Sequence, residues 1–212
     1  MIIPALLTKN KDELQSMINT CSAFTDYVQI DIMDGKFVPS ESVSLSTVKD
    51  LIIPVRSEAH LMVTDPLEWL DVFKKLGSEK IVFHYEIKKD HKDIITRIKD
   101  VGLKAGLAVN PLTKINKFKP LLGFVDSVLF LSVNPGFYGA DFIPEVLDKI
   151  KDFKRLYPEI EAGVDGGIKP DNAVLAKRAG ADFICVGSAI LKSRDPAQAY
   201  RNLLKSINEQ VS

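Results

Sequence analysis

Acidic and histidine side chains stand near the ends of several apolar segments of this 212-residue chain. Asp31 lies near the end of the apolar segment 27–32, and His60 near the end of segment 55–61. Asp165 directly follows segment 160–164. Buried charged groups are costly unless they are paired, hydrogen-bonded or bound to a metal ion. A single aspartate at such a place more often caps a turn. Three chemically active groups at matching positions instead favour a cation site made by Asp31, His60 and Asp165.

The residues on either side of Asp31 extend this prediction. Side chains alternate along a strand, so Gln29 and Asp31 point to the same face, and Met33 joins them if the strand continues. A polar amide and a carboxylate on one face suit the placement of a ligand.

Other polar residues near strand ends are expected to be structural. Asp34–Gly35 is an ordinary turn pair, and its carboxylate is expected to bind loop backbone. His84 is expected to be a satisfied residue at the rim, beside Tyr85 and Glu86, with a direct chemical role as the less favoured alternative. His91, among lysines and aspartates, is expected on the solvated surface.

Glycines after the last two apolar segments predict a phosphate site. Gly166–Gly167 and Gly187–Ser188 let the backbone approach an anion without a Cβ in the way, and the serine adds a hydroxyl donor. Barrels of alternating strands and helices commonly bind phosphate at these two places. The segment 132–139, which contains Gly136, is expected to close over the ligand. Plain glycine turns are the alternative.

Alternating strands and helices must position these groups. Apolar segments without polar alternation are typical of parallel strands covered on both faces. Helical spacing of apolar residues separates most of them, and glycines such as Gly77 and Gly102 stand where helices end. The pattern predicts a (β/α)8 TIM barrel of class α/β, because eight units fit this length. An open doubly wound sheet is the alternative, and the chain lacks its usual glycine-rich nucleotide motifs. The eight expected strands are residues 2–7, 27–32, 55–61, 80–84, 104–109, 127–131, 160–164 and 183–186.

Length and charge narrow the function. The chain is expected to form one domain spanning residues 1–212. Lysine plus arginine equals aspartate plus glutamate at 28 each, so no overall field favours nucleic acid or an anionic membrane. A small-molecule substrate is therefore expected, with no nucleic acid or membrane as partner. The oligomeric state stays open, a homo-oligomer included.

Cysteine content and hydropathy predict a location in the cytoplasm. Cys21 and Cys185 are expected to be buried thiols rather than metal ligands. The N-terminal residues lack the apolar core of a signal peptide, and no apolar segment approaches the ~18 residues of a membrane span. A reducing, cytoplasmic environment follows.

Six segments give the chain a specific resemblance, which runs from Ile3 to about Ala199. It resembles the ribulose-phosphate 3-epimerase family in the order and spacing of these segments. They are Asp31–Pro39 (DIMDGKFVP), His60–Met62 (HLM), Ser132–Phe137 (SVNPGF), Phe142–Pro144 (FIP), Val164–Gly167 (VDGG) and Val186–Ile190 (VGSAI).

The resemblance implies an isomerase that acts on a sugar phosphate. In that family two histidines and two aspartates bind a divalent metal, and the aspartates also serve as the acid and base that invert C3 of D-ribulose 5-phosphate. Asp31, His60 and Asp165 match this set, which implies Zn, Fe, Mn or Co as cofactor. His60 and Gly136 match family positions at the substrate, and Met33 and Met62 match positions that line the reacting carbon.

The chain departs from the family pattern around the metal and the substrate. Gln29 stands in place of the first metal histidine, and an amide binds such metals more weakly than imidazole. Ala5 replaces a serine that contacts substrate, Leu131 replaces a third methionine, and Ser40 replaces an asparagine. Residues 138–140 differ from the family's Gly-Gly-Gln.

Three functions are therefore considered. The favoured hypothesis is an epimerase on D-ribulose 5-phosphate, forming D-xylulose 5-phosphate, or on a related ketose phosphate, with a modified metal shell. The second is a sugar-phosphate-binding barrel that has lost metal-dependent epimerase activity. The third is another reaction through an enediolate, such as decarboxylation or aldol-type cleavage, for which the nearest lysine candidate, Lys36, lies in a loop.

Overall fold

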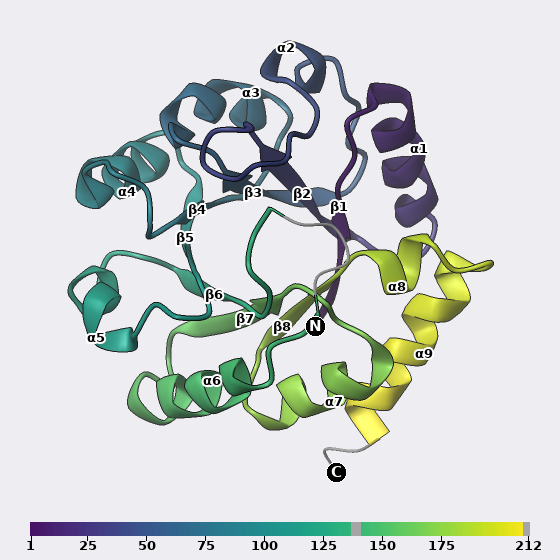
Figure 1. Cartoon of the computed structure of the whole chain (residues 1–212). Helices are drawn as coiled ribbons and strands as arrows, with labels where there is room; N and C mark the ends of the chain where they lie inside the picture. The colour runs from purple at the N-terminus through teal and green to yellow at the C-terminus, as the bar shows by residue number, and fades with distance from the viewer. Residues whose placement is uncertain (137–140, 210–212) are drawn as a thin grey trace.

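Eight parallel strands form a closed barrel in the computed structural model, which describes residues 1–136 and 141–209 (Figure 1). The predicted (β/α)8 barrel is confirmed, and the open sheet is excluded because the first strand pairs with the last. Four predicted strands have the observed bounds, and the other four differ by one residue at one or both ends. The strands are β1 Ile2–Leu6, β2 Tyr27–Met33, β3 Arg56–Met62, β4 Lys80–His84, β5 Lys104–Val109, β6 Ser127–Leu131, β7 Glu161–Asp165 and β8 Phe183–Val186.

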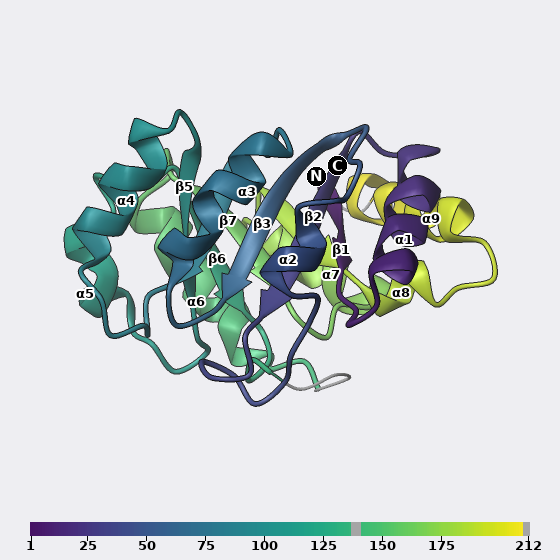
Figure 2. The same ribbon diagram turned by 90° about the horizontal axis from the view of Figure 1, so that it is seen from above.

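Helices surround the barrel as an outer layer (Figures 1 and 2). Gly77 and Gly102 follow two of the helices with φ of 78° and 80°, a conformation that favours glycine and ends a helix, as predicted. In the described residues the helices are α1 Lys11–Ser22, α2 Leu45–Val48, α3 Leu70–Lys75, α4 His91–Asp100, α5 Ile115–Phe118, α6 Glu145–Leu156, α7 Pro170–Arg178, α8 Ser188–Leu191 and α9 Pro196–Glu209, with 3-10 turns η1 Pro66–Trp69 and η2 Lys119–Leu121.

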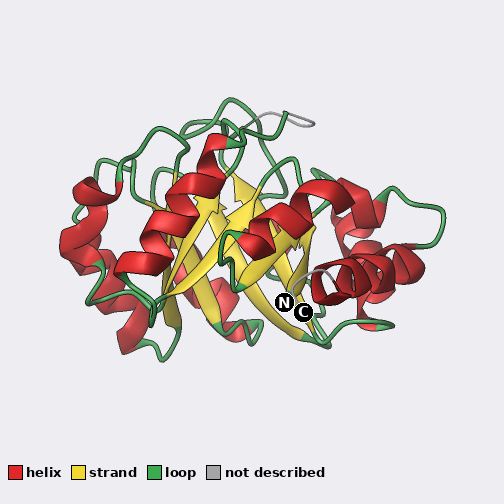
Figure 3. Cartoon of the chain, turned by 90° about the horizontal axis from the view of Figure 1, so that it is seen from below, coloured by secondary structure: helices red, strands yellow, loops and turns green. Residues whose placement is uncertain are grey.

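Two apolar layers hold the structure together. The larger lies between the outer faces of the strands and the helices, and contains fully buried residues such as Phe73 and Phe153. The smaller fills the barrel interior with residues such as Val82, Leu129 and Phe183. Both faces of the strands are thus covered, which explains why their sequences are continuously apolar. Helices flanking the strands on both sides are visible in Figure 3.

A polar cluster lies in the barrel interior at the N-terminal ends of the strands. Lys80 Nζ lies 2.6 Å from Glu58 Oε2, and the Tyr27 hydroxyl donates to the same oxygen at 3.2 Å. The ammonium group also lies over the Phe183 ring, 4.5 Å from its centre. Pairing makes these buried charges tolerable.

The structure also tests the predictions that both cysteines are buried thiols and that no segment spans a membrane. Cys21 in α1 and Cys185 in β8 are both buried and free, as expected. Burial raises the pKa of the Cys21 thiol to about 11. Among residues 1–136 and 141–209, the helices are all too short or too polar to cross a bilayer.

Candidate functional site

The loops after the C-terminal ends of the strands lie at the upper side of Figure 3. Residues of these loops and of the strand ends line a cavity at the mouth of the barrel. Its volume is about 340 Å³. Strand alternation directs Asp31 and Met33 of β2 into it, together with His60 and Met62 of the neighbouring β3. Catalytic groups of this fold come from these strand ends, so the cavity is the candidate active site.

Asp31, His60 and Asp165 form one cluster at the floor of this cavity. The parallel register of β2 and β3 sets Asp31 beside His60. His60 Nδ1 lies 3.1 Å from Asp31 Oδ1 and 3.4 Å from Asp165 Oδ2, so one imidazole nitrogen faces both carboxylates. The His60 side chain is fully buried, whereas the two carboxylates keep slight access to the cavity. The structure therefore brings together the three residues predicted to bind a cation.

Gln29 lies beneath these carboxylates and is fully buried. Its Nε2 donates to Asp31 Oδ1 at 2.8 Å and to Asp165 Oδ2 at 2.7 Å, and its Oε1 accepts from Cys185 Sγ at 3.0 Å. A half-turn of the amide would exchange the two atoms and present the oxygen to the aspartates. The contact between Gln29 and Cys185 was not predicted, because nothing in the sequence relates β2 to β8 across the barrel.

Burial and close charges shift the pKa values of this cluster. Burial, reinforced by the charge of Asp165, raises the pKa of Asp31 to about 6. Burial alone would lower the pKa of His60, but hydrogen bonds to Asp165 and Asp31 outweigh it and raise the value to about 10. The metal-free cluster thus favours an imidazolium between two carboxyl groups, one of which titrates near neutral pH.

His84 is not the rim residue that the sequence suggested. It is fully buried at the end of β4, and its Nε2 lies 3.0 Å from Nε2 of His60. Its position follows the inward parity of Val82, a barrel-interior residue, and this parity is the signal by which the sequence could have revealed it. His91, expected on the surface, is half-buried: it stacks on Tyr85 and its Nε2 lies 2.6 Å from the Tyr85 carbonyl oxygen.

Asp34 has the structural role predicted for it. Oδ1 accepts from the backbone N–H groups of Lys36 and Phe37 at 2.9 and 2.8 Å. Oδ2 accepts from the backbone and hydroxyl of Thr64 at 2.7 and 2.8 Å. The carboxylate therefore ties the loop after β2 to the loop after β3, beside the cavity.

Two glycines permit close packing of the mouth loops. A Cβ on Gly136 would lie 2.7 Å from Val38 Cβ, and one on Gly166 would lie 2.4 Å from Val133 Cγ2. Both have positive φ, at 94° and 109°. Ser132 adds a further tie, since its hydroxyl donates to the Gly166 carbonyl at 2.6 Å. Residues 137–139 of the predicted closing segment, 132–139, lie outside the described residues.

The predicted phosphate residues line one side of the cavity. Gly166–Gly167 and Gly187–Ser188 contribute to its wall after β7 and β8, and Gly136 lines the cavity from the loop after β6. Lys192, at the end of α8, also lines the cavity and is exposed. Sequence analysis missed this lysine because a basic residue after a short apolar helix is common on any surface.

Apolar side chains cover much of the remaining wall. Met33, Met62, Ala5 and Leu131 all line the cavity, at the positions where the sequence departs from or matches the related family. Met17 of α1 lines it too and was not predicted. Such a wall limits water at the carboxylates, while the polar floor and glycine side can receive a polar ligand.

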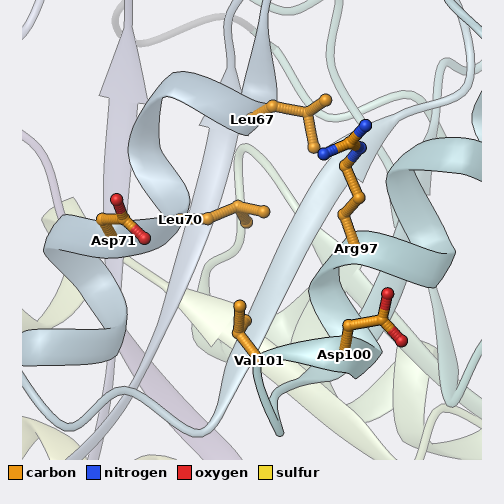
Figure 4. A pocket seen from close by; sticks show the side chains of 6 residues that line it. All are labelled: Leu67, Leu70, Asp71, Arg97, Asp100 and Val101. Atoms are coloured by element: carbon orange, nitrogen blue, oxygen red, sulfur yellow. The ribbon is translucent and has the colours of Figure 1, made fainter.

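A second hollow lies on the outside of the barrel, between η1, α3 and α4 (Figure 4). Its volume is about 290 Å³. Leu70 of α3 points into the space between α3 and α4. Arg97, on its α4 side, is paired with Asp93 at 3.2 Å. The hollow lacks a convergent set of reactive side chains among the described residues, so the barrel mouth remains the candidate site.

The cluster at the mouth has the donor atoms of a divalent metal site. One ligand atom each from Asp31, His60 and Asp165 lies within 4.8 Å of the others. Carboxylate oxygen and imidazole nitrogen are ligands for Zn, Fe, Mn and Co. These three residues fit a metal ion, whereas Gln29, as its amide is oriented, presents a donor N–H to them.

The fold and the site define a class: (β/α)8 barrels with an acidic and histidine cluster at the C-terminal mouth and glycine-lined loops beside it. Residues 1–191 match the Ribulose-phosphate 3 epimerase family. The cytoplasmic isoform of ribulose-phosphate 3-epimerase from Oryza sativa subsp. japonica is 33% identical over 188 residues, 86% of this chain and 82% of the relative. A ribulose-phosphate 3-epimerase from Synechocystis sp. is 34% identical, covering 97% of this chain and 94% of the relative.

The chain belongs to the ribulose-phosphate 3-epimerase family, as the resemblance predicted. The expected enzyme class, an isomerase acting on carbohydrates, is confirmed at this level. Solved structures support the fold independently. The 3-hexulose-6-phosphate synthase from Salmonella typhimurium superposes with a TM-score of 0.72 at 17% identity, covering 99% of both chains.

Proposed function

We propose that the protein interconverts D-ribulose 5-phosphate and D-xylulose 5-phosphate, or a closely related pair of ketose phosphates, by proton transfer at C3. The observation that carries the proposal is the pair of carboxylates, Asp31 and Asp165, on either side of His60 Nδ1 at the floor of the cavity. The names of the curated relatives support the same activity.

Two carboxylates provide the base and the acid that an inversion requires. One removes the C3 proton, and the electron pair of the broken C–H bond moves toward the C2 carbonyl to give an enediolate. The other returns a proton to the opposite face of C3.

Asp31, His60 and Asp165 are the residues that would hold a divalent metal ion. When bound, such an ion would supply Lewis-acid stabilisation of the negative charge that develops on the substrate oxygens. His60 and Gln29 meanwhile hold the two carboxylates in place through the contacts already described, and the methionine wall excludes water.

The substrate phosphate is proposed to bind on the glycine side of the cavity. Gly166–Gly167 and Gly187–Ser188 offer backbone without side-chain obstruction, and Gly136 closes this side from the β6 loop. The positive charge of Lys192 lies on the same wall. Anchoring the phosphate there leaves the sugar to extend toward Asp31 and Asp165 along the apolar wall.

The experiment is solvent exchange at C3. D-Ribulose 5-phosphate is incubated with the protein and Mn²⁺, Fe²⁺, Co²⁺ or Zn²⁺ in deuterated water, and deuterium at C3 of both ketoses is measured by NMR. We expect label in the product and in recovered substrate, and loss of label with the Asp165→Asn variant. Absence of label with every ketose phosphate tried would refute the proposal.

The two hydrogen bonds from Gln29 to the carboxylates of Asp31 and Asp165 favour a second candidate. This candidate is a sugar-phosphate-binding barrel without metal-dependent epimerase activity. An amide that already satisfies the two aspartates competes with a metal ion for them. This candidate predicts thermal stabilisation by sugar phosphate with no bound metal and no turnover. The epimerase proposal predicts metal in the purified protein and turnover on the same ligands.

A location in the cytoplasm stays a prediction, supported by the name of the rice relative.

A further inference from the structure

His84, at the end of β4, takes no part in the proposed reaction and yet contacts His60 at its centre. His84 is fully buried, and its ring stacks on that of His60 with centres 5.1 Å apart and an interplanar angle of 20°. Their Nε2 atoms lie 3.0 Å apart, within hydrogen-bond distance. Phe37 covers the His84 ring, with centres 4.9 Å apart. The contact between the histidines is therefore closed to water.

The other nitrogen of His84 faces an acid. His84 Nδ1 lies 3.5 Å from Glu86 Oε2, and neither atom has a hydrogen-bond partner among the described residues. A buried imidazole nitrogen next to a carboxylate is stabilised when it carries the proton, because the alternative sets two lone pairs against each other.

This placement determines the direction of the bond between the histidines. If Nδ1 of His84 carries the proton, the neutral ring presents a lone pair at Nε2 and accepts from His60 Nε2–H. His60 therefore keeps a proton on Nε2 whether or not its Nδ1, which faces Asp31 and Asp165, also carries one. A histidine that binds metal through one nitrogen normally donates the other N–H to a fixed acceptor.

Glu86 is itself held from the next loop. Its Oε1 accepts from the backbone N–H of Asn110 at 2.9 Å and from the Thr113 hydroxyl. Lys149 of α6 donates to three carbonyl oxygens of this loop, those of residues 110, 111 and 113, at 2.9, 2.7 and 3.1 Å. The carboxylate beside His84 is thus anchored through Oε1 to a loop that Lys149 holds in place.

We propose that Glu86 and His84 are positioning residues that hold the proton of His60 on Nε2, so that Nδ1 is directed at the two aspartates and available to a metal ion. The proposal rests on the proposed function only in that His60 is taken to be a ligand of the metal ion. The hydrogen bond between the two histidines can be tested in the metal-free protein, without measuring turnover.

The first test uses the metal-free protein. Two-dimensional ¹H–¹⁵N spectra of the ring nitrogens are recorded for a chain that has only three histidines. In the wild type we expect an exchange-protected Nε2–H for His60 and an Nδ1–H for His84. His84→Leu removes the acceptor and should abolish the protected His60 signal, whereas His84→Gln, whose amide oxygen can replace Nε2, should restore it.

The second test measures metal affinity by competition with a chelator, using Co²⁺ and Zn²⁺. His84→Leu should weaken binding about 10- to 100-fold, the range found when an outer hydrogen-bond partner of a metal ligand is removed. Glu86→Gln, which keeps an acceptor for Asn110 and loses the charge, should weaken binding about 10-fold. His91→Leu is the matched control, since it removes a histidine that stacks on Tyr85 away from His60, and should leave affinity unchanged.

The outcomes separate this proposal from the proposed function. If His84→Leu keeps the protected His60 proton and wild-type metal affinity, the positioning role is wrong, whatever the turnover. If the wild type shows no exchange at C3 but His84→Leu loses the proton and the metal, the epimerase proposal fails and the positioning role stands. Should His84→Leu not fold, Glu86→Gln in both measurements decides the question.

Discussion

Replacing Gln29 by methionine tests how the neighbouring carboxylates of Asp31 and Asp165 tolerate each other without metal. Methionine has a similar length and flexibility but no hydrogen-bond donor. The substitution removes the bonds from Nε2 to Asp31 at 2.8 Å and to Asp165 at 2.7 Å. Among the described residues, His60 then remains as the nearest side-chain donor to Asp31 and Asp165.

The expected loss of stability follows from these two bonds and from one pKa. A hydrogen bond to a charged group contributes about 1.5–3 kcal/mol, so the two bonds together set an upper limit of roughly 3–6 kcal/mol. The pair can escape part of this loss by taking up a proton on Asp31, whose pKa is already raised to about 6. At pH 8 that proton costs roughly 3 kcal/mol, and at pH 6 almost nothing. We expect a loss of about 4 kcal/mol at pH 8 and about 2 kcal/mol at pH 6.

The sign of the pH effect is a sharper test than its size. Gln29→Met raises the folded-state pKa of Asp31 still further above its unfolded value. A group shifted in this direction contributes stability at low pH and loses it as the pH rises through the folded-state pKa. The loss caused by the substitution must therefore grow from pH 6 to pH 8.

The assay is urea unfolding of metal-free protein in chelator at both pH values. Gln15→Met is the matched control. Gln15 exchanges two neutral hydrogen bonds with the Ile52 backbone at 2.8 and 2.9 Å, and its loss should cost about 1 kcal/mol, equally at both pH values. A Gln29→Met effect that is independent of pH, or no larger than that of Gln15→Met, would show that the amide does not stabilise the carboxylate pair.

Four further predictions concern the core, a loop, the chemistry and the metal. Gly163→Ala would place a Cβ 2.1 Å from the Phe183 ring and should destabilise by about 1–3 kcal/mol or more in urea unfolding, whereas Gly123→Ala, with no atom within 4 Å, should be near neutral. Lys149→Met removes three charged hydrogen bonds to a loop and should lower the unfolding free energy by about 2 kcal/mol. Asp165→Asn should reduce kcat about 10²–10⁴-fold while sugar phosphate still raises the melting temperature, and loss of that stabilisation would point to a binding role. Removal of metal by a chelator should abolish exchange at C3, and activity that survives complete removal would argue against a metal-assisted reaction.

The fold could be predicted from the sequence because parallel strands covered on both faces leave a simple pattern. Continuous apolar segments such as Lys104–Val109 alternate with helical spacing, and the observed strands differ from the predicted ones by at most one residue at an end. Barrel closure was inferred from the number of units. It is shown by the pairing of β1 with β8, a contact between segments about as far apart as the chain allows.

The candidate site was predictable in part for the same reason. Asp31, His60 and Asp165 interrupt apolar strands at their C-terminal ends, and such interruptions in this fold meet at one mouth. His84 occupies an equivalent position but was assigned to the rim, because the polar residues after it were given more weight than the inward parity that it shares with Val82. Only the register of β4 within the closed barrel sets its ring against that of His60.

The sequence by itself determined which segments form strands and which polar residues interrupt their C-terminal ends, since period-2 alternation and apolar continuity are local properties of the chain. Only the tertiary structure decided that Gln29 joins Asp31 to Asp165, because that bond spans 136 positions of sequence. It also decided that His60 lies between two carboxylates and a second imidazole. Distances of about 3 Å between residues of different strands depend on the closure and register of the whole barrel, which no local pattern encodes.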